Sequence, residues 1–312
     1  MESLNRMAIE LVDEAIDFTD ELDIGAFELE NGATVLDFGV DHAGGLEAGM
    51  LLAEIQTAGL ATIQTGMGEV AGAPFPNVEL ACDRPAFALL LSQKAGWELS
   101  VDGYDGLGSG PARALVAEED EYREMGYTDA FEFGVLSIES DELPTEAVAA
   151  HVADMAEIDP SGVFLPTFPT ASIAGSVSTA ARAAELAVFR LFEGGYDPYD
   201  ILSVSGSAPV APVAGSEGEA MGRTNDALAY GGSVHMTVRE DSDTFSSLAS
   251  SATDTYGTPF VEVFSEADWD FSAVDPDVFA PARITVDVVG GDTYAFGSLN
   301  EGLLAESFGL DG

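Results

Sequence analysis

The chain has 312 residues, enough for one large domain or two of ordinary size, and its 46% hydrophobic content can fill a substantial core. Its net charge is −46, from 56 acidic residues against 10 basic ones. Intrinsic disorder is not expected, because disordered chains combine high charge with low hydrophobicity. Nucleic-acid binding is not expected either, because it requires cationic side chains. Anionic membrane surfaces would repel such a chain.

The first segment, residues 1–18, places apolar residues at helical spacing between acidic ones, so we expect an amphipathic helix there. It has neither the basic start nor the continuous apolar run of a signal peptide. No stretch of the chain reaches the 18 apolar residues of a membrane span. The sequence therefore predicts a cytoplasmic protein that does not enter a membrane.

Strand-like and helix-like segments then alternate along the chain. Strands are predicted at residues 33–40, 60–65, 97–101, 131–138, 162–168, 201–206, 233–239 and 282–289. Helices are predicted at residues 44–54, 85–95, 145–156, 176–192, 216–229, 243–253 and 300–309. This alternation predicts an α/β fold, and the elements fit two modest sheets better than one doubly wound sheet. The polar run at 140–144 places a domain boundary between 1–140 and 141–312, with interleaved segments as an alternative.

The acidic residues are spread along the whole chain, and only one of the ten bases is a lysine, Lys94. Charge of this size destabilises a compact fold by self-repulsion in dilute buffer. Multimolar salt reduces the screening length to about 3 Å and makes the repulsion tolerable. The composition therefore favours a halophilic cytosolic protein over a mesophilic acidic one.

Histidine and cysteine are too scarce for most metal or disulfide chemistry. A single cysteine, Cys82, excludes an intramolecular disulfide and is expected to be a buried hydrophobe. The three histidines, His42, His151 and His235, lie far apart and show no metal-binding spacing. We expect them to be structural or exposed, and we expect no metal site.

A glycine-rich stretch, GLGSGPARAL at 106–115, follows a predicted strand. The backbone around Ser109 and Gly110 has the composition of an anion-binding turn, with Arg113 close behind it. The stretch lacks the lysine of a Walker loop and does not fit the GxGxxG pattern. The alternative is a tight turn that leads into a helix.

The segment 168–195 combines the end of a strand, a loop of small residues and a helix that ends at a glycine pair. Arg182 and Glu185 are three residues apart and so lie on the same side of this helix. No acidic residue occurs from 176 to 184, although acids are abundant elsewhere. The pattern indicates a functional pair, and the alternative is an ordinary ion pair on the helix surface.

A second loop and helix, residues 207–232, begin with a proline-rich stretch that includes Pro209. Arg223, Asn225 and Asp226 follow on the helix. Such a unit could present amide and carboxylate groups to a heterocycle with several donors. The alternative is a proline-rich connection followed by a capped helix.

Several segments, taken together and in this order, resemble the methenyltetrahydromethanopterin cyclohydrolase family of archaea and methylotrophs. The matching segments are the N-terminal helix, ELENGATVLDFGVDHAGGLEAG, SQKAGW, GSGPARAL, PTASIAGSV, the helix with Arg182 and Glu185, APVAPVAG, MGRTNDALAYGG, YGTPF and FAPA. Most are weak individually, but their combination extends over nearly the whole chain and is specific.

The resemblance implies two α/β domains that enclose an interdomain pocket, assembled as a homotrimer without a metal or redox cofactor. It implies a hydrolase of one-carbon metabolism, related to methanogenesis, that opens the N5,N10-methenyl bridge of a tetrahydromethanopterin-type carrier to the N5-formyl form. Glu185 would act as general base and then as acid, while Arg182 holds it ionised and oriented. The pterin ring would meet the 207–226 region, and the turn with Arg113 would bind an anionic tail or a phosphate.

Three alternatives remain open at this stage. The same ring opening on methenyl-tetrahydrofolate would use the same catalytic residues. A non-catalytic pterin- or phosphate-binding module could have kept the scaffold, although an intact Arg182 and Glu185 argue against it. A phosphate-dependent acyltransferase lacks a plausible nucleophile in this sequence.

Overall fold

The computed structural model describes residues 2–269 and 273–310. The chain forms two compact units, of which unit 1 comprises Met1–Ala61 and Phe87–Ser178, and unit 2 comprises Thr62–Ala86 and Thr179–Gly312. The chain changes unit three times, so the boundary predicted at 140/141 lies inside unit 1. The reason is strand pairing, because β8 (Ser137–Glu139) is hydrogen-bonded both to β6 (Tyr104–Ser109), before that position, and to β9 (Val163–Phe168), after it.

Within the described residues, unit 1 contains a seven-stranded sheet with the order β1-β2-β9-β8-β6-β5, and β7 also pairs with β9. The remaining strands of this sheet are β1 (Gly25–Glu28), β2 (Thr34–Asp37), β5 (Ala95–Val101) and β7 (Gly134–Val135). β9 runs parallel to β2, β7 and β8, whereas the outer pairs are antiparallel. A central parallel strand is covered on both faces, which accounts for the continuous apolar sequence of β9, VFLPTF.

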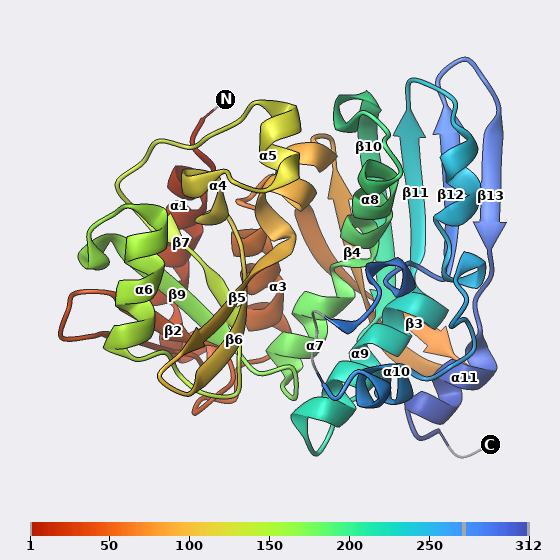
Figure 1. The fold of residues 1–312 in the computed structure, drawn as a ribbon. Helices are drawn as coiled ribbons and strands as arrows, with labels where there is room; N and C mark the ends of the chain where they lie inside the picture. The colour runs from red at the N-terminus through yellow and green to blue at the C-terminus, as the bar shows by residue number, and fades with distance from the viewer. Residues whose placement is uncertain (1, 270–272, 311–312) are drawn as a thin grey trace. The chain divides into compact units, whose positions relative to one another are not determined.

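Unit 2 contains a six-stranded sheet with the order β13-β12-β11-β10-β4-β3. Its strands are β3 (Thr62–Val70), β4 (Ala73–Cys82), β10 (Ile201–Pro209), β11 (Ser233–Val238), β12 (Arg283–Val288) and β13 (Thr293–Gly297). β11 and β12 are parallel, and all other neighbours are antiparallel. Figure 1 shows both sheets with their helices. The prediction of an α/β fold with two sheets is confirmed.

Several helices begin at a side-chain cap. The hydroxyl of Ser3 accepts a hydrogen bond from the Arg6 backbone at the start of α1, and Thr145 and Ser216 cap α6 and α9 in the same way. Unit 1 holds α1 (Leu4–Asp17), α2 (Thr19–Leu22), α3 (Leu46–Gln56), α4 (Arg113–Val116), α5 (Asp120–Met125), α6 (Glu146–Ala156) and α7 (Ile173–Ala180). Unit 2 holds α8 (Ala183–Glu193), α9 (Glu217–Gly231), α10 (Phe260–Glu266) and α11 (Glu301–Ser307).

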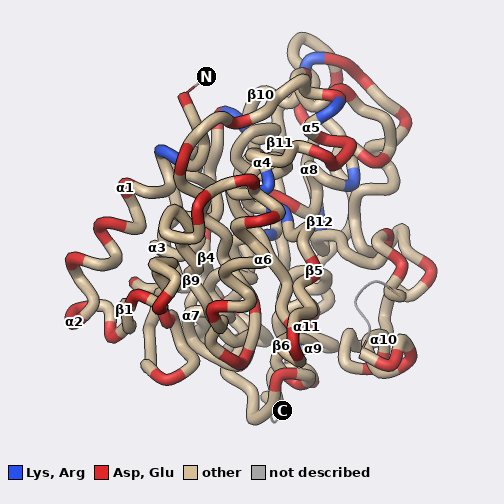
Figure 2. The backbone as a smooth tube through the Cα atoms, turned by 60° about the vertical axis from the view of Figure 1, so that its left-hand side comes forward, with Lys and Arg blue, Asp and Glu red and all other residues tan. Residues whose placement is uncertain are grey.

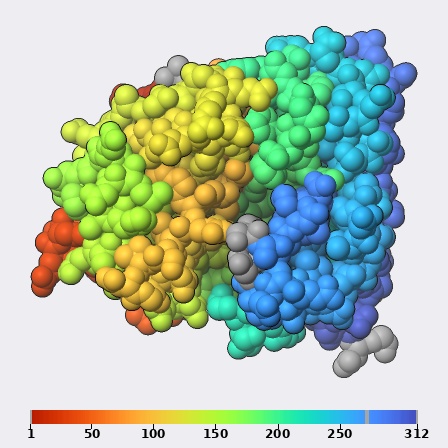
Figure 3. Space-filling model, in the orientation of Figure 1, coloured from red at the N-terminus to blue at the C-terminus, as the bar shows by residue number. Residues whose placement is uncertain are grey.

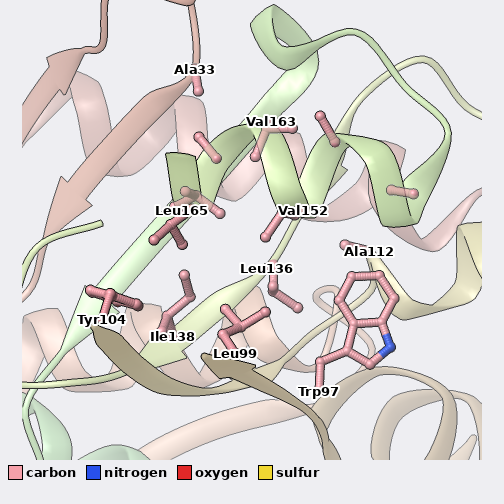
Figure 4. Packing of buried hydrophobic residues seen from close by; sticks show 14 residues of the cluster. Ala33, Trp97, Leu99, Tyr104, Ala112, Leu136, Ile138, Val152, Val163 and Leu165 are labelled. Atoms are coloured by element: carbon pink, nitrogen blue, oxygen red, sulfur yellow. The ribbon is translucent and has the colours of Figure 1, made fainter. Parts of the chain in front are cut away.

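Each unit has its own hydrophobic core. In unit 1, Trp97, Leu99, Leu136, Ile138 and Leu165 project from the sheet onto the buried side of α6 (Figure 4). In unit 2, one cluster combines Tyr230 of α9, Phe260 and Phe264 of α10, and Leu304 of α11. The segment that contains α10, in blue, lies at the surface of this unit (Figure 3).

The charges are distributed unequally between surface and interior. Acidic residues occur along the whole tube in Figure 2, whereas lysine and arginine are few. Four of the basic side chains are largely buried, with exposed fractions of 17% for Lys94, 0% for Arg113, 12% for Arg182 and 9% for Arg190. These four cations form their ion pairs where salt screens them least.

Several predicted elements differ from those observed. The strands β1, β4, β6 and β13 were not predicted, because short or glycine- and proline-containing strands give a weak apolar pattern. The helix predicted at 243–253 is two 3-10 turns, Asp243–Ser247 and Ser250–Ala252. The helix predicted at 85–95 is a π-helix, Ala86–Gln93, and the one at 176–192 is divided into α7 and α8.

Candidate active site

Arg182 and Glu185 form an ion pair in unit 2. Nη1 of Arg182 donates to Oε2 of Glu185 over 3.2 Å, and the two side chains are 12% and 6% exposed. Surface pairs are weakened by solvent and salt, but a pair buried to this degree retains most of its electrostatic interaction. The two residues are thus more than an ordinary pair on the helix surface.

The break between α7 and α8 determines where this pair lies. The sequence predicted one continuous helix, but α7 ends at Ala180 and Arg182 becomes the N-cap residue of α8. The Arg182 backbone N–H donates to the Thr179 carbonyl over 2.9 Å, which closes the turn between the helices. Glu185 therefore lies in the first turn of α8, where unpaired N–H groups and the helix dipole favour a negative charge.

Strand β10 holds the start of α8 closely. A Cβ atom added to Gly206 would lie 2.8 Å from the backbone nitrogen of Ala184 and 2.9 Å from its Cβ atom. Any side chain at position 206 would push the first helical turn away from the sheet. The contact fixes the residue just before Glu185, so the carboxylate is carried on a rigid support.

This arrangement is suited to acid–base chemistry. A positioned carboxylate can take a proton from a bound water and so act as a general base. The guanidinium of Arg182 compensates part of the loss of hydration and fixes the direction of the oxygens. Glu185 can accept a proton, keep it, and return it to a second atom nearby.

The glycine-rich turn of unit 1 is a structural turn. Gly110 has φ +113°, which favours glycine, and its N–H donates to the Ser92 carbonyl over 2.8 Å. The hydroxyl of Ser109 accepts a hydrogen bond from Nε2 of Gln56 over 3.4 Å. Since the N–H of Ala112 also donates to a carbonyl, that of Val135, these amides are directed at the protein itself. The expected anion-binding turn is not supported by this geometry.

Arg113 is likewise committed to partners inside unit 1. Its Nε donates to Glu119 over 2.9 Å, its Nη2 pairs with the other oxygen of Glu119, and its Nη1 donates to the Lys94 carbonyl over 2.6 Å. The guanidinium lies 5.6 Å from the ring centre of Tyr122 and has no exposed surface. A side chain enclosed in this way supports the fold, and its expected contact with an anionic tail stays a prediction.

Two of the residues predicted on α9 have partners within their own helix. Arg223 forms an ion pair with Glu219, one turn earlier, and its side chain is 22% exposed. Nδ2 of Asn225 donates to the Met221 carbonyl over 2.9 Å. Pro209 ends β10 and packs close to Gly231, at the end of α9.

Asp226 has a structural role that the sequence did not indicate. It is buried, and its Oδ1 accepts a hydrogen bond over 2.9 Å from the backbone of Phe260, the first residue of α10. Its Oδ2 accepts one over 2.6 Å from the hydroxyl of Ser307 in α11. Burial raises the pKa of Asp226 to about 6, although these two hydrogen bonds lower it. Asp226 thus joins three helices, and the expected contact with a heterocycle is not supported.

Asp37 is a buried acid that the sequence pattern did not single out. It ends β2, is fully buried, and accepts backbone hydrogen bonds from Gly39, Val40, Asp41 and His42 at 2.6–3.1 Å. Burial opposes its charge, but these bonds and a 2.9 Å contact with Nδ1 of His42 prevail, so the pKa of Asp37 is lowered. The signal was available in the sequence, as an acid at the end of an apolar strand followed two residues later by glycine.

A second polar contact lies at the same edge of the unit 1 sheet. Thr170, just after β9, donates a hydrogen bond to Glu139 at the end of β8. The hydroxyl of Ser172 accepts from the backbone of Gly175 over 2.9 Å and so orders the loop into α7. The carboxyl ends of parallel strands meet at one edge, which is where α/β sheets commonly bind ligands.

The described residues offer little else for metal or thiol chemistry. In residues 2–269 and 273–310, no group of three or more His, Cys, Asp or Glu side chains is placed to hold a metal ion. Cys82 is buried, and burial raises its pKa to about 11. No helix in this part of the chain is both long and apolar enough to cross a membrane.

Comparison with known proteins extends the resemblance along the chain. The family model described as Cyclohydrolase (MCH) matches residues 3–308. A methenyltetrahydromethanopterin cyclohydrolase of Halobacterium salinarum is 64% identical over 310 residues, covering 99% of this chain and 100% of that protein. Proteins of the same name from Methanosarcina mazei and Methanococcoides burtonii are 41% and 40% identical, each over 99% of both chains.

The match of the whole chain to a cyclohydrolase model and to cyclohydrolases of high identity defines an enzyme of the hydrolase class. The chain belongs to the cyclohydrolase (MCH) family, since the family model and the relatives cover nearly its whole length. The resemblance seen in the sequence is thereby confirmed.

Proposed function

We propose that this protein hydrolyses the N5,N10-methenyl bridge of a tetrahydromethanopterin-type carrier to the N5-formyl compound. The observation that carries the proposal is the buried Arg182–Glu185 pair in the first turn of α8, in a chain 64% identical along its length to a cyclohydrolase of that name. The substrate is a small pterin molecule, and the reaction needs no resident cofactor.

The chemistry requires one base that later becomes an acid. The methenyl bridge is an amidinium cation, so its carbon is already electrophilic toward water. Glu185 takes a proton as the water oxygen bonds to this carbon, which gives a neutral tetrahedral adduct with a hydroxyl group. The bond between the carbon and N10 then breaks, N10 receives the proton from Glu185, and the hydroxyl proton is lost as the N5-formyl carbonyl forms. The net reaction consumes one water and releases one proton.

Arg182 keeps Glu185 ready for both steps. Its guanidinium donates to one carboxylate oxygen over 3.2 Å and so fixes the direction of the carboxylate. A fixed acid–base group of this kind typically accelerates a reaction by about 10²–10⁴-fold. Because Arg182 caps α8 and Glu185 follows three residues later, both side chains move with the same helical turn.

The test is the loss of methenyl absorbance in molar KCl, with the tetrahydromethanopterin and the tetrahydrofolate carrier in separate arms. Glu185→Gln keeps the shape of the side chain but cannot take a proton, so kcat should fall about 10²–10⁴-fold. Glu193→Gln, at the exposed end of the same helix, is the matched control and should keep full activity. Near wild-type turnover by Glu185→Gln would remove this residue from the mechanism, and turnover of the folate carrier alone would reassign the substrate.

We further propose that the protein works in concentrated salt in the cytoplasm. Support comes from the net charge of −46, the burial of several of its few cations, and the high identity to a Halobacterium protein. A dense acidic surface is tolerable where salt screens its self-repulsion.

A further inference from the structure

One asparagine of unit 1 is followed by glycine, in a chain that has five asparagines. This pair is Asn31–Gly32, and the other four asparagines precede larger residues. Asparagine is a chemically labile residue. It is most labile before glycine, because its side-chain carbon is attacked by the next backbone nitrogen and glycine has no Cβ atom to obstruct the approach. The pair is therefore a candidate site for covalent modification.

The pair lies in the loop between β1 and β2, which is ordered by backbone hydrogen bonds. The N–H of Leu29 donates to the Ala33 carbonyl over 2.8 Å, and the N–H of Gly32 donates to the Leu29 carbonyl over 2.9 Å. A Cβ atom added to Gly32 would lie 2.9 Å from Cβ of Ser161, so the loop rests on the 3-10 turn Pro160–Gly162. The attacking nitrogen is thus engaged, since it must lose the proton that it donates to Leu29.

The carboxamide of Asn31 is held by two further hydrogen bonds. Its Oδ1 accepts from the backbone N–H of Ala33 over 3.2 Å. Its Nδ2 donates over 3.1 Å to the carbonyl of Glu146, the first residue of α6. Attack by the Gly32 nitrogen requires the carboxamide to leave these partners and turn toward that nitrogen. The folded loop therefore protects Asn31, and the reaction requires a local opening of the loop.

The charges close to this loop are negative and exposed. Glu28 and Glu30 flank it, Glu146 accepts the hydrogen bond of the carboxamide, and Asp159 caps the turn on which the loop rests. None of the ion pairs in the described part of the chain involves any of these four acids. Their repulsion is screened within about 3 Å in molar salt but extends over about 30 Å at 0.01 M. Removal of salt therefore favours the open loop.

We propose that Asn31 is a deamidation site whose reaction is controlled by salt. In the opened loop, the Gly32 nitrogen forms a bond to the side-chain carbon of Asn31. The bond from that carbon to Nδ2 breaks, and ammonia leaves with the proton of the Gly32 nitrogen. Water then opens the cyclic imide at either carbonyl, which gives aspartate or isoaspartate at this position. The reaction consumes one water, releases one ammonia and needs no oxidant or reductant.

The product cannot re-form the native loop. A carboxylate has no N–H to donate to the Glu146 carbonyl, and it adds a negative charge beside four acids. Isoaspartate also lengthens the backbone by one carbon atom, which displaces the first pair of the hairpin ladder, Glu28 and Thr34. The modification therefore makes a reversible loss of structure in dilute buffer irreversible.

The test is mass spectrometry of the peptide that contains Asn31, after incubation of the wild-type protein at mildly alkaline pH in molar KCl and in dilute buffer. Conversion, a gain of about one mass unit, should be about 10-fold or more faster in dilute buffer, because the loop opens there. The peptide with Asn300, which precedes Glu301, is the internal control and should stay unconverted over the same period. Equal rates in the two solutions, or no conversion of Asn31 in dilute buffer, would overturn the proposal.

Return to molar KCl tests the consequence of the modification. Chains with intact Asn31 should recover their native circular dichroism, and modified chains should not. Asn31→Asp introduces the charge without lengthening the backbone and should need more KCl to fold than the wild type. Asn300→Asp adds the same charge at the N-cap of α11, where a carboxylate is favoured, and should fold at the wild-type KCl concentration. Full recovery of the modified chains, or the same KCl midpoint for both variants, would contradict the role given to this loop.

Discussion

Gly206 of β10 lies so close to Ala184 of α8 that a Cβ atom at position 206 would approach the Ala184 nitrogen to 2.8 Å. This contact between strand and helix determines the position of the first turn of α8, and therefore of the Arg182–Glu185 pair. The position of the proposed catalytic residue therefore depends on Gly206, which belongs to no recognisable sequence motif.

Gly206→Ala is expected to displace the first turn of α8. We predict a fall in kcat of about 10-fold or more, since small shifts of a catalytic group are strongly felt. Gly302→Ala, at an exposed position of α11, would place its Cβ atom 3.9 Å from the nearest neighbour, Oδ1 of Asn300, and should keep both activity and stability. The two variants are compared by turnover and by thermal unfolding. Equal activity of the two would show that α8 tolerates the shift.

Glu119→Gln is expected to destabilise unit 1, because it leaves the guanidinium of Arg113 buried without its counter-charge. Removing one partner of a buried pair costs about 3–5 kcal/mol of unfolding free energy. Arg123→Gln breaks the exposed pair with Asp120 and should change stability by less than about 1 kcal/mol. Denaturant unfolding in molar salt measures both. A large rise in KM at unchanged stability would return Arg113 to substrate binding.

Asp226 gives a pH dependence whose sign can be stated. The pKa of Asp226 is raised to about 6 in the folded protein from an unfolded value of 3.8. Between pH 3.8 and about 6, the folded state therefore binds more protons than the unfolded state. The resulting stabilisation is complete below the unfolded value and is lost as pH rises through about 6. Asp226→Asn keeps partners for both hydrogen bonds and removes the titration.

The measurement is the free energy of unfolding of wild type and Asp226→Asn from about pH 4 to pH 7. Over this interval, the free energy of unfolding of the variant should rise by about 2–3 kcal/mol relative to that of the wild type. The exposed Asp154→Asn serves as the control and should leave the pH profile unchanged. Parallel profiles for wild type and Asp226→Asn would contradict the raised pKa.

Asp37→Asn should loosen the loop from Gly39 to His42. An amide has one accepting oxygen and would turn its NH2 group toward backbone donors, so buried N–H groups lose partners at about 1–3 kcal/mol each. Hydrogen exchange of residues 39–42 should accelerate, whereas Asp41→Asn, at an exposed position, should leave it unchanged. Unaltered protection in Asp37→Asn would mean that the loop is held by other contacts.

Salt should control the stability of the whole chain. With a net charge of −46, transfer from molar KCl to dilute buffer should lower the unfolding temperature, because self-repulsion is no longer screened. Circular dichroism during a KCl titration measures this. A midpoint that is independent of salt would reject the halophilic interpretation.

The sequence by itself was sufficient for the α/β class, the two sheets, the family and the pairing of Arg182 with Glu185. The fold class and the pair depend on local periodicity and on residues three positions apart. The family depends on the order of the segments that resemble it, and all of these can be read along a single chain. The strands missed, β1, β4, β6 and β13, are those whose apolar pattern is short or interrupted by glycine and proline.

Only the tertiary structure decided which polar residues were already occupied. Arg113 and Asp226 have the composition of a binding site, but Glu119, Ser307 and the Phe260 backbone reach them from other parts of the fold. Asp37 is likewise occupied, because the loop that follows it folds back and donates backbone hydrogen bonds to its buried carboxylate. A sequence shows which groups can bind, whereas their availability depends on long-range contacts that chain order does not contain.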